Sequence, residues 1–327
     1  MRRLLALFTT AALAAAAPAA AQDQPAPPPA PAPPPAPAAG QMTVVVDHVG
    51  TFATTLVGKH IRVRGNVAPY VEGQEAVVRF YRGGKKILAR RAKVKPGASG
   101  TTGHFKVPFT TKLSGKVTIR VTKPATATQV KITAPAQHVL VLPDHVGVGA
   151  RGDAVRLLQR ALKALGYVPG RRGTYDARTG RAVLAFRKVS GLPRTSIADR
   201  ALFRRIANGG GHFKVRYPGH GKHVEADLSR QVLALIDHGK VQRIYPTSSG
   251  KPSTPTVLGH YRFYSKTPGF NSHQMYFSNY FIGGYAIHGY FDVPVYNASH
   301  GCLRIPNPDA YSVYQWVQIG DRIDVYT

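Results

Sequence analysis

Residues 285–305 read YAIHGYFDVPVYNASHGCLRI and contain the only cysteine of the protein. Cys302 ends a Ser-His-Gly-Cys run, and a second histidine, His288, lies fourteen positions upstream at the end of an apolar stretch. A thiol is a good nucleophile only as the thiolate, and a neighbouring imidazole can take its proton. Gly301 allows a tight turn and a close approach of substrate. The pattern indicates a nucleophilic cysteine; the alternative is a small buried apolar side chain.

Two elements, Ile-His-Gly at 287–289 and Ser-His-Gly-Cys-Leu-Arg at 299–304, resemble the signature of the L,D-transpeptidase (YkuD) family of bacterial cell-wall enzymes. The resemblance covers about residues 212–327 and includes two further stretches between 224 and 259. Strand-like runs dominate this region and predict a mainly β sandwich or barrel with Cys302 at the rim of a cleft. The resemblance implies that this fold is YkuD-like.

The resemblance implies how such a site works. Cys302 is the nucleophile, and His288 is the general base that takes its proton and later returns it. We expect His300 to orient the site or to contact substrate. The peptide N–H groups of Gly301 and Cys302 are candidates for an oxyanion hole. Ser299 either hydrogen-bonds an imidazole or is only a turn residue.

Further side chains are candidates for substrate binding. Arg304 suits a carboxylate by bidentate contact, with a structural arginine at a buried edge as the alternative. Tyr276 and Tyr285 are expected to contact substrate, although aromatic core packing is an alternative for Tyr276. Asp292 is close to His288 in sequence, but a backbone carbonyl would orient that imidazole equally well.

The family also implies the substrates, which are peptidoglycan stem peptides acting as donor and acceptor. The enzyme would release the terminal D-alanine of a tetrapeptide stem and pass the acyl group to an amine of a neighbouring stem, which makes a 3–3 cross-link. Transfer to water would make it an L,D-carboxypeptidase, and acylation by carbapenems is implied as well. Two alternatives stay open: a cysteine peptidase or amidase that only hydrolyses the wall, and a non-enzymatic basic wall-binding protein.

The beginning of the chain predicts export. Residues 1–21 read as a secretory signal peptide, with a charged start, an apolar stretch and small residues at its end. An uncleaved membrane anchor is the alternative. Residues 22–41 are rich in Pro and Ala and predict an extended linker. We expect the protein in the cell wall or a periplasm-like space, where a single unpaired cysteine favours chemistry over a disulfide.

The composition bears on partners. Lys and Arg total 44 against 15 Asp and Glu, a net charge of +29 with neutral histidines. For an exported protein this charge favours anionic cell-wall polymers rather than nucleic acid. We expect no cofactor and no metal site, because the 13 histidines are scattered and no His-Glu-x-x-His element or second cysteine is present.

Two domains are expected before the catalytic one. Residues 42–142 show short alternating strand-like runs and a Gly83–Gly84 hairpin turn, which predict an immunoglobulin-like β domain acting as a spacer. Residues 147–209 show helical periodicity, with a first helix that ends at Gly166 and a third that starts near Ser196. This segment resembles the three-helix peptidoglycan-binding module, with a helical linker domain as the alternative. The positions matching the module are Gln159, Tyr167 and Asp176, of which Asp176 should cap the second helix.

The expected catalytic domain spans residues 210–327. Its one helix should be capped by Asn307, carry Pro308 in its first turn and end at Gly320. The fold class is therefore a multidomain protein: a mainly β catalytic domain preceded by a small all-α domain and an immunoglobulin-like β domain.

Overall fold

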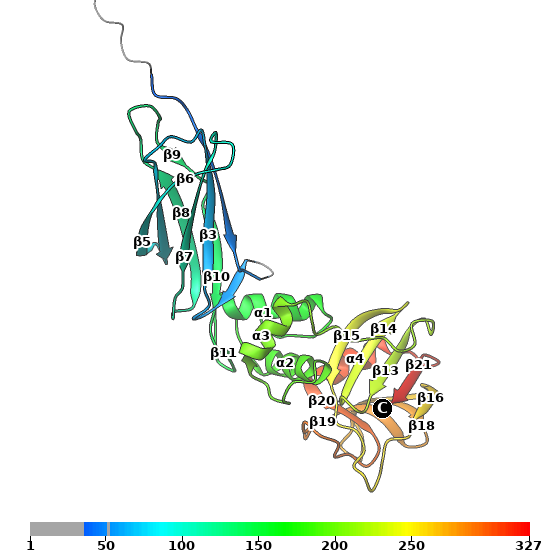
Figure 1. The fold of residues 1–327 in the computed structure, drawn as a ribbon. Coiled ribbons are helices and arrows are strands. Elements are labelled where there is room, and N and C mark those ends of the chain that lie inside the picture. The colour runs from blue at the N-terminus through cyan, green and yellow to red at the C-terminus, as the bar shows by residue number, and fades with distance from the viewer. Residues whose placement is uncertain (1–35, 51–52) are drawn as a thin grey trace, which may run out of the picture. The chain divides into compact units, whose positions relative to one another are not determined.

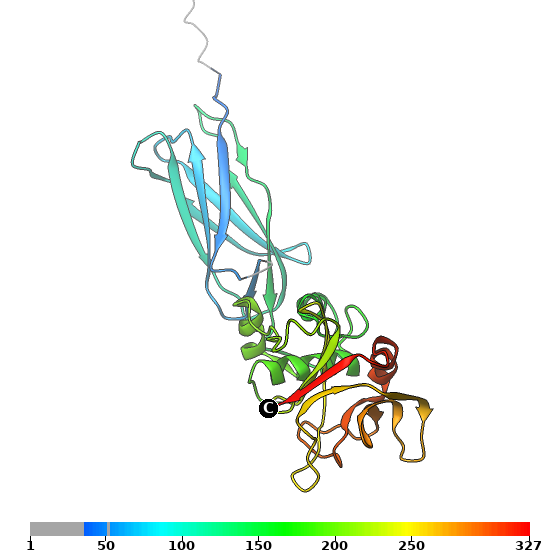
Figure 2. The same cartoon turned by 90° about the vertical axis from the view of Figure 1, so that its right-hand side faces the viewer.

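The computed structural model describes residues 36–50 and 53–327 (Figures 1 and 2). The predicted signal peptide (1–21) and most of the predicted linker (22–41) lie outside these residues. A strand-rich segment comes first, three helices follow, and a second strand-rich segment carries the fourth helix. The predicted multidomain, mainly β fold class with a small helical domain in the middle is confirmed.

The N-terminal strands form two sheets around one apolar core. The first sheet contains β1 (Gln41–Asp47), β3 (Ile61–Ala68), β7 (Gly103–Phe109) and β6 (Lys95–Pro96). The second contains β2 (Thr54–Leu56), β10 (Gln137–Leu142), β8 (Gly115–Lys123), β4 (Glu75–Arg82) and β5 (Lys85–Lys93), with β9 (Ile132–Thr133) beside β8. Alternate residues such as Val63 and Ile119 fill the core. Gly83 and Gly84 form the predicted hairpin turn, both with positive φ.

The helical domain consists of α1 (Asp153–Ala164), α2 (Ala177–Val189) and α3 (Arg200–Ala207), with a small sheet of β11 (His145–Val146) and β12 (Ala198–Asp199). Gly166 follows α1 with a φ of 90°, and the Asp176 carboxylate accepts a hydrogen bond from the Thr179 N–H, so both predicted boundaries are confirmed. The predicted start of the third helix near Ser196 is wrong. Pairing of β12 with β11 keeps the preceding residues extended, and Asp199 caps the helix instead.

The C-terminal domain is a sandwich of two sheets. The first contains, in order, β15 (Lys240–Pro246), β14 (Val232–Asp237), β13 (His223–Asp227), β21 (Arg322–Tyr326) and β16 (Gly259–Arg262). The second contains β17 (Ser265–Phe270), β18 (Tyr276–Ile282), β19 (Tyr285–Tyr290) and β20 (Leu303–Pro306). Both sheets and α4 (Asn307–Trp316) share one core. Asn307 is the first helical residue rather than the predicted cap, because Pro306 holds the extended cap position.

Helix α2 packs on the outer face of the five-stranded sheet, against β14 and β15. Val232, Ala234 and Ile244 of these strands share an apolar core with helix residues such as Phe186. Lys188 of α2 is buried there, and its Nζ donates to carbonyl oxygens on the C-terminal domain. The helical domain and the C-terminal domain are therefore joined by a continuous core.

Candidate active site

The site is built on the parallel pair β19 and β20, in which His288 lies opposite Arg304. Ile287 and Leu303, also opposite each other, are fully buried in the sandwich core. Since side chains alternate along a strand, His288 and Arg304 project from the other face. Cys302 directly precedes β20, and the Arg304 charge acts on both the thiol and the His288 imidazole. The fold thus brings the chain segments of Cys302 and His288 beside each other.

A tight turn presents Cys302. The Ser299 hydroxyl donates to the Cys302 carbonyl oxygen over 2.6 Å and accepts from the Gly301 N–H over 3.1 Å. Gly301 has a φ of 118°, and a methyl group there would overlap the Tyr285 ring. Ser299 is therefore a turn residue and does not hold an imidazole. The Gly301 N–H, an expected oxyanion donor, is already engaged by Ser299, which leaves the Cys302 N–H as the remaining candidate of the pair.

The thiol is half-buried and protonated in this arrangement. Cys302 Sγ lies 3.7 Å from the Gly284 carbonyl oxygen, to which the S–H donates. Burial raises the pKa of the Cys302 thiol, although the Ala286 backbone and the Arg304 charge act in the opposite direction. A neutral thiol would need a base in order to act as a nucleophile.

The imidazole of His288 is suited to that task. It is 3% exposed, and burial lowers its pKa to about 4, so it is neutral at physiological pH. Its Nδ1 lies 2.8 Å from the Gly289 carbonyl oxygen. A carbonyl only accepts, so Nδ1 carries the proton and Nε2 keeps a free lone pair. The orienting group is this carbonyl and not Asp292, which is exposed. Sγ is bonded to Gly284 and not to His288 in this structure.

The Arg304 guanidinium lies 4.2 Å from the centre of the Tyr290 ring, which meets His288 edge to face. Among the described residues no carboxylate pairs with it, so its charge remains available beside the thiol. Arg304 therefore stays a candidate for binding a carboxylate.

A group of aromatic side chains lies next to the site. Tyr276 is half-buried and packs against Phe270 with ring centres 4.4 Å apart. Phe270 stacks on Phe291, which is 71% exposed and neighbours Tyr290. Tyr276 therefore belongs to a partly exposed aromatic cluster, whereas Tyr285 covers the Cys302 turn. His300 is exposed, with Nε2 3.2 Å from Lys251 Nζ, and no contact joins it to the thiol.

Sequence reasoning missed the residues that hold the turn from behind. The Gln231 side chain accepts from the Ser249 N–H and donates to its hydroxyl, and the Ser249 carbonyl accepts from the Ser299 N–H. The Thr256 hydroxyl donates to the Gly301 carbonyl over 2.8 Å. Lys188 of the helical domain donates to the Gln231 carbonyl over 3.0 Å. A network of buried hydrogen bonds thus links helix α2 to the Cys302 turn.

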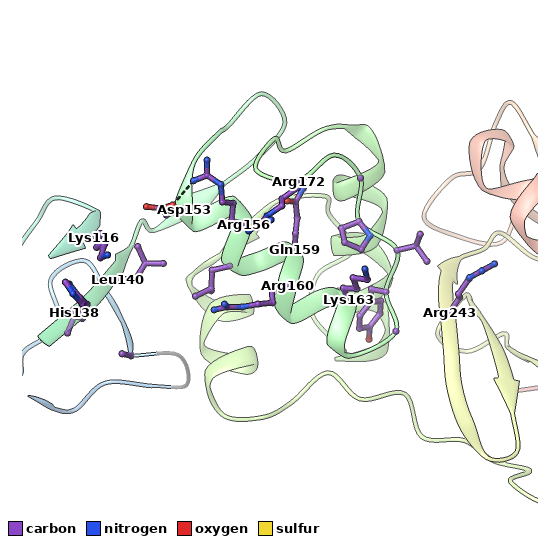
Figure 3. A pocket seen from close by; sticks show the side chains of 18 of the residues that line it. Lys116, His138, Leu140, Asp153, Arg156, Gln159, Arg160, Lys163, Arg172 and Arg243 are labelled. Atoms are coloured by element: carbon purple, nitrogen blue, oxygen red, sulfur yellow. Dashed lines mark hydrogen bonds and ion pairs between the residues drawn. The ribbon is translucent and has the colours of Figure 1, made fainter. Parts of the chain in front are cut away.

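The helical domain has a basic groove beside α1. Two of the residues that match the peptidoglycan-binding module stabilise the fold of this domain. The Gln159 side chain donates to the carbonyls of Arg171 and Thr174, and the Tyr167 hydroxyl donates to the Gly211 carbonyl. The groove is a cavity of about 970 Å³, and Figure 3 shows its side chains. The basic side chains drawn along α1, the following loop and β15 are Arg156, Arg160, Lys163, Arg172 and Arg243.

Comparison with known proteins identifies two domains of the chain. The family model of the L,D-transpeptidase catalytic domain (YkuD) matches residues 221–325, and that of a putative peptidoglycan binding domain matches residues 151–206. A crystal structure of the L,D-transpeptidase from Xylanimonas cellulosilytica DSM 15894 is 32% identical, with a TM-score of 0.52, and the match covers 56% of this chain and 98% of that one. The chain belongs to the L,D-transpeptidase (YkuD) family.

Other L,D-transpeptidase structures are more distant. One from Stackebrandtia nassauensis is 21% identical, with 56% of this chain and 95% of that chain covered and a TM-score of 0.34. One from Mycobacterium smegmatis is 13% identical, with 88% and 100% covered and a TM-score of 0.30. No curated protein matches the chain.

The two family domains define the general function of this L,D-transpeptidase family member. They support an enzyme whose substrate is peptidoglycan and which is associated with the cell wall. Within the described residues, no helix is long and apolar enough to cross a membrane.

Proposed function

We propose that the protein is a peptidoglycan L,D-transpeptidase that forms 3–3 cross-links through a thioester on Cys302, with His288 as general base and acid. The observation that carries the proposal is the pairing of β19, which holds His288, with β20, which directly follows Cys302, the only thiol of the sequence. The Gly289 carbonyl engages His288 Nδ1, which leaves the Nε2 lone pair for a proton. The division into a secretory signal (1–21), a linker (22–41), a β spacer (42–142), a wall-binding helical domain (147–209) and a catalytic domain (210–327) is part of this proposal.

The reaction begins from two neutral groups. The thiol rotates away from the Gly284 carbonyl, Sγ attacks the carbonyl carbon of the donor stem, and Nε2 takes the thiol proton. The tetrahedral intermediate collapses to a thioester when the D-alanine nitrogen leaves with that proton. An amine of the acceptor stem then attacks the thioester, a new amide forms, and the proton released by the amine returns to Sγ through His288. Water in place of the amine would give trimming instead of cross-linking.

The neighbours of the pair supply binding and charge stabilisation in this scheme. The Cys302 N–H faces the developing oxyanion, a kind of contact whose loss typically costs about 2.7–4 kcal/mol in acyl transfer. Arg304 binds a carboxylate of the stem, because its guanidinium has no acidic partner among the described residues. Tyr276 contacts the stem through the exposed aromatic cluster, Tyr285 fixes the turn, and exposed His300 contributes to substrate binding.

The products of a reaction with purified protein distinguish this function from the alternative functions. Purified protein is incubated with disaccharide-tetrapeptides, and the muropeptides are analysed by mass spectrometry. The proposal predicts dimers joined by a 3–3 bond together with free D-alanine. Tripeptides without dimers would indicate an L,D-carboxypeptidase, and cleavage at other bonds would indicate a peptidase or amidase. An unchanged substrate would indicate that the protein binds the wall without this enzymatic activity.

The basic groove gives a second prediction. Reversing two exposed groove charges, Lys163→Glu with Arg172→Glu, should reduce binding of the full chain to insoluble sacculi severalfold, because stem carboxylates and other wall anions lose their partners. The matched control is Lys85→Glu with Lys86→Glu on the exposed β4–β5 hairpin, which changes the net charge equally. Equal losses in the two proteins at matched salt would show that only total charge matters, and no loss in either would make the helical domain a spacer.

A further inference from the structure

A cluster of three metal-ligating side chains lies away from Cys302, on the outer face of the five-stranded sheet. His220 precedes β13, His260 is in β16 and Asp324 is in β21, where it lies directly opposite His260. His260 Nδ1 is 2.6 Å from Asp324 Oδ1, and His220 Nδ1 is 3.0 Å from Oδ2. All three potential ligand atoms lie within 4.8 Å of one another. The fold has therefore assembled two nitrogens and a carboxylate from three distant parts of the chain.

Asp324 is a buried carboxylate whose close partners are imidazoles. Its side chain is fully buried, and among the described residues its ion-pair partners are all histidines. His223, also buried, faces the Gly221 carbonyl with Nδ1 and the Glu225 carboxylate with Nε2. Its Nε2 is 3.9 Å from Asp324 Oδ2, farther away than the Nδ1 atoms of the two outer imidazoles, His220 and His260. These two imidazoles therefore make the close contacts to the Asp324 carboxylate.

The two outer imidazoles are held in orientation by an aromatic ring. Tyr217 stacks on His220 at 5.1 Å between ring centres, with an interplanar angle of 11°. It meets His260 edge to face at 5.0 Å and 88°. The Tyr217 N–H in turn donates to buried Glu225 over 2.8 Å. The site is thus preorganised by a surrounding layer of contacts, as metal sites usually are.

We propose that Asp324, His220 and His260 bind a divalent transition-metal ion, with Zn²⁺ as the best match to this donor set. Two imidazole nitrogens and one carboxylate oxygen are typical ligands of Zn²⁺, which takes a water molecule in the fourth tetrahedral position. The site is separate from the Cys302 chemistry. Its bound ion fastens the segment that carries Tyr217 and His220 to strands β16 and β21.

Two of the three spacings between the ligand atoms are already close to those of a metal site. The ligand atoms of a tetrahedral zinc site lie about 3.3 Å apart for bonds of about 2.0 Å. The present nitrogen–oxygen contacts of 2.6–3.2 Å are therefore close to the required spacing. In the metal-free protein each Nδ1 donates its proton to Asp324. On binding, that proton moves to Nε2 of the same ring and the Nδ1 lone pair binds the ion, so no net proton is released when both imidazoles are neutral.

The test uses a parent in which the thiol is absent, because Cys302 would itself bind zinc. Full-length Cys302→Ser protein is stripped with a chelator and titrated with Zn²⁺ by calorimetry, and with Co²⁺ by visible absorbance. We expect one equivalent to bind, a Co²⁺ spectrum of tetrahedral nitrogen and oxygen ligation, and a higher unfolding temperature with Zn²⁺ than without it.

Zinc affinities of two variants and one control variant test whether the ion binds at these residues. His260→Ala and Asp324→Asn should each weaken binding roughly 100-fold or more, because even groups that only orient ligands contribute about 10–100-fold. His260 is half-exposed on an edge strand, so its truncation leaves the core intact. His238→Ala, in an exposed turn of the same sheet, should bind like the parent. Less than one equivalent in the parent, or the same affinity in parent and His260→Ala, would overturn the proposal.

Discussion

A Cys302→Ser protein is expected to form no covalent adduct with a carbapenem and no 3–3 cross-linked muropeptides. Cys302 is the only thiol, and a serine hydroxyl at the same place is far harder to ionise. Its neighbour His288, with a pKa of about 4, is too weak a base to compensate. Intact-mass spectrometry after incubation with the drug measures the adduct directly, and the muropeptide digest measures turnover.

The same variant should keep its fold. The side chain is half-buried and serine is nearly isosteric, so the unfolding temperature should match that of the natural protein within a few degrees. A folded variant without adduct assigns the chemistry to the sulfur. An adduct that survives both Cys302→Ser and Cys302→Ala would refute the thioester mechanism, and so would a natural protein that forms no adduct.

A His288→Ala protein is expected to lose about 10²–10⁴-fold in acylation rate, the usual contribution of a positioned general base. The pH dependence identifies the same group. The natural protein should lose activity as the pH falls through about 4, because protonation of Nε2 removes the lone pair that accepts the thiol proton. The slow residual rate of His288→Ala should show no such fall. Single-turnover acylation followed by mass spectrometry between pH 3.5 and 8 makes the comparison.

Protonation of His288 also has a consequence for stability. Its pKa is lower in the folded protein than the value of about 6.5 in an unfolded chain. The unfolded chain therefore binds the proton more readily, and this residue makes the protein less stable as the pH falls from about 6.5 to about 4. The matched control for His288→Ala is His300→Ala, which removes an exposed imidazole 3.2 Å from Lys251 Nζ and should retain partial activity. An inactive His300→Ala beside an active His288→Ala would reverse the assignment of the base.

The local parts of the fold and of the site could be predicted from the sequence. Three features depend only on neighbours within a few residues: the alternation of apolar and polar residues in the strands, the Gly83–Gly84 hairpin turn and the Asp176 helix cap. The structure has the turn and the cap where they were expected. Cys302 and His288 could be paired because each lies in a short distinctive element and adjacent strands bring the two elements together. The start of the third helix was misjudged because Ser196 and Asp199 are both good capping residues. Only pairing of β12 with β11 decides between them.

Interactions between distant segments could not be predicted. The link from Lys188 through Gln231 to Ser249 joins two domains, and no periodicity or spacing signals it. The histidines looked scattered because His220 and His260 are 40 positions apart along the chain. The register of β13, β21 and β16 places them beside Asp324. The position of Ser299 also depends on geometry, since its hydroxyl hydrogen-bonds the Cys302 carbonyl and the Gly301 N–H of the turn.

The apolar outer face of strands β14 and β15 is covered by helix residues of the segment that matches the putative peptidoglycan binding domain. A fragment trimmed to the catalytic match at residue 221 would show Val232, Ala234, Ile236 and Ile244 to water and would tend to aggregate. It would also lack the Lys188 side chain, which donates to the Gln231 carbonyl behind the Cys302 turn. The smallest truncated form that preserves the surroundings of the thiol therefore starts ahead of α1, and we expect removal of the helical domain to disturb the Cys302 turn.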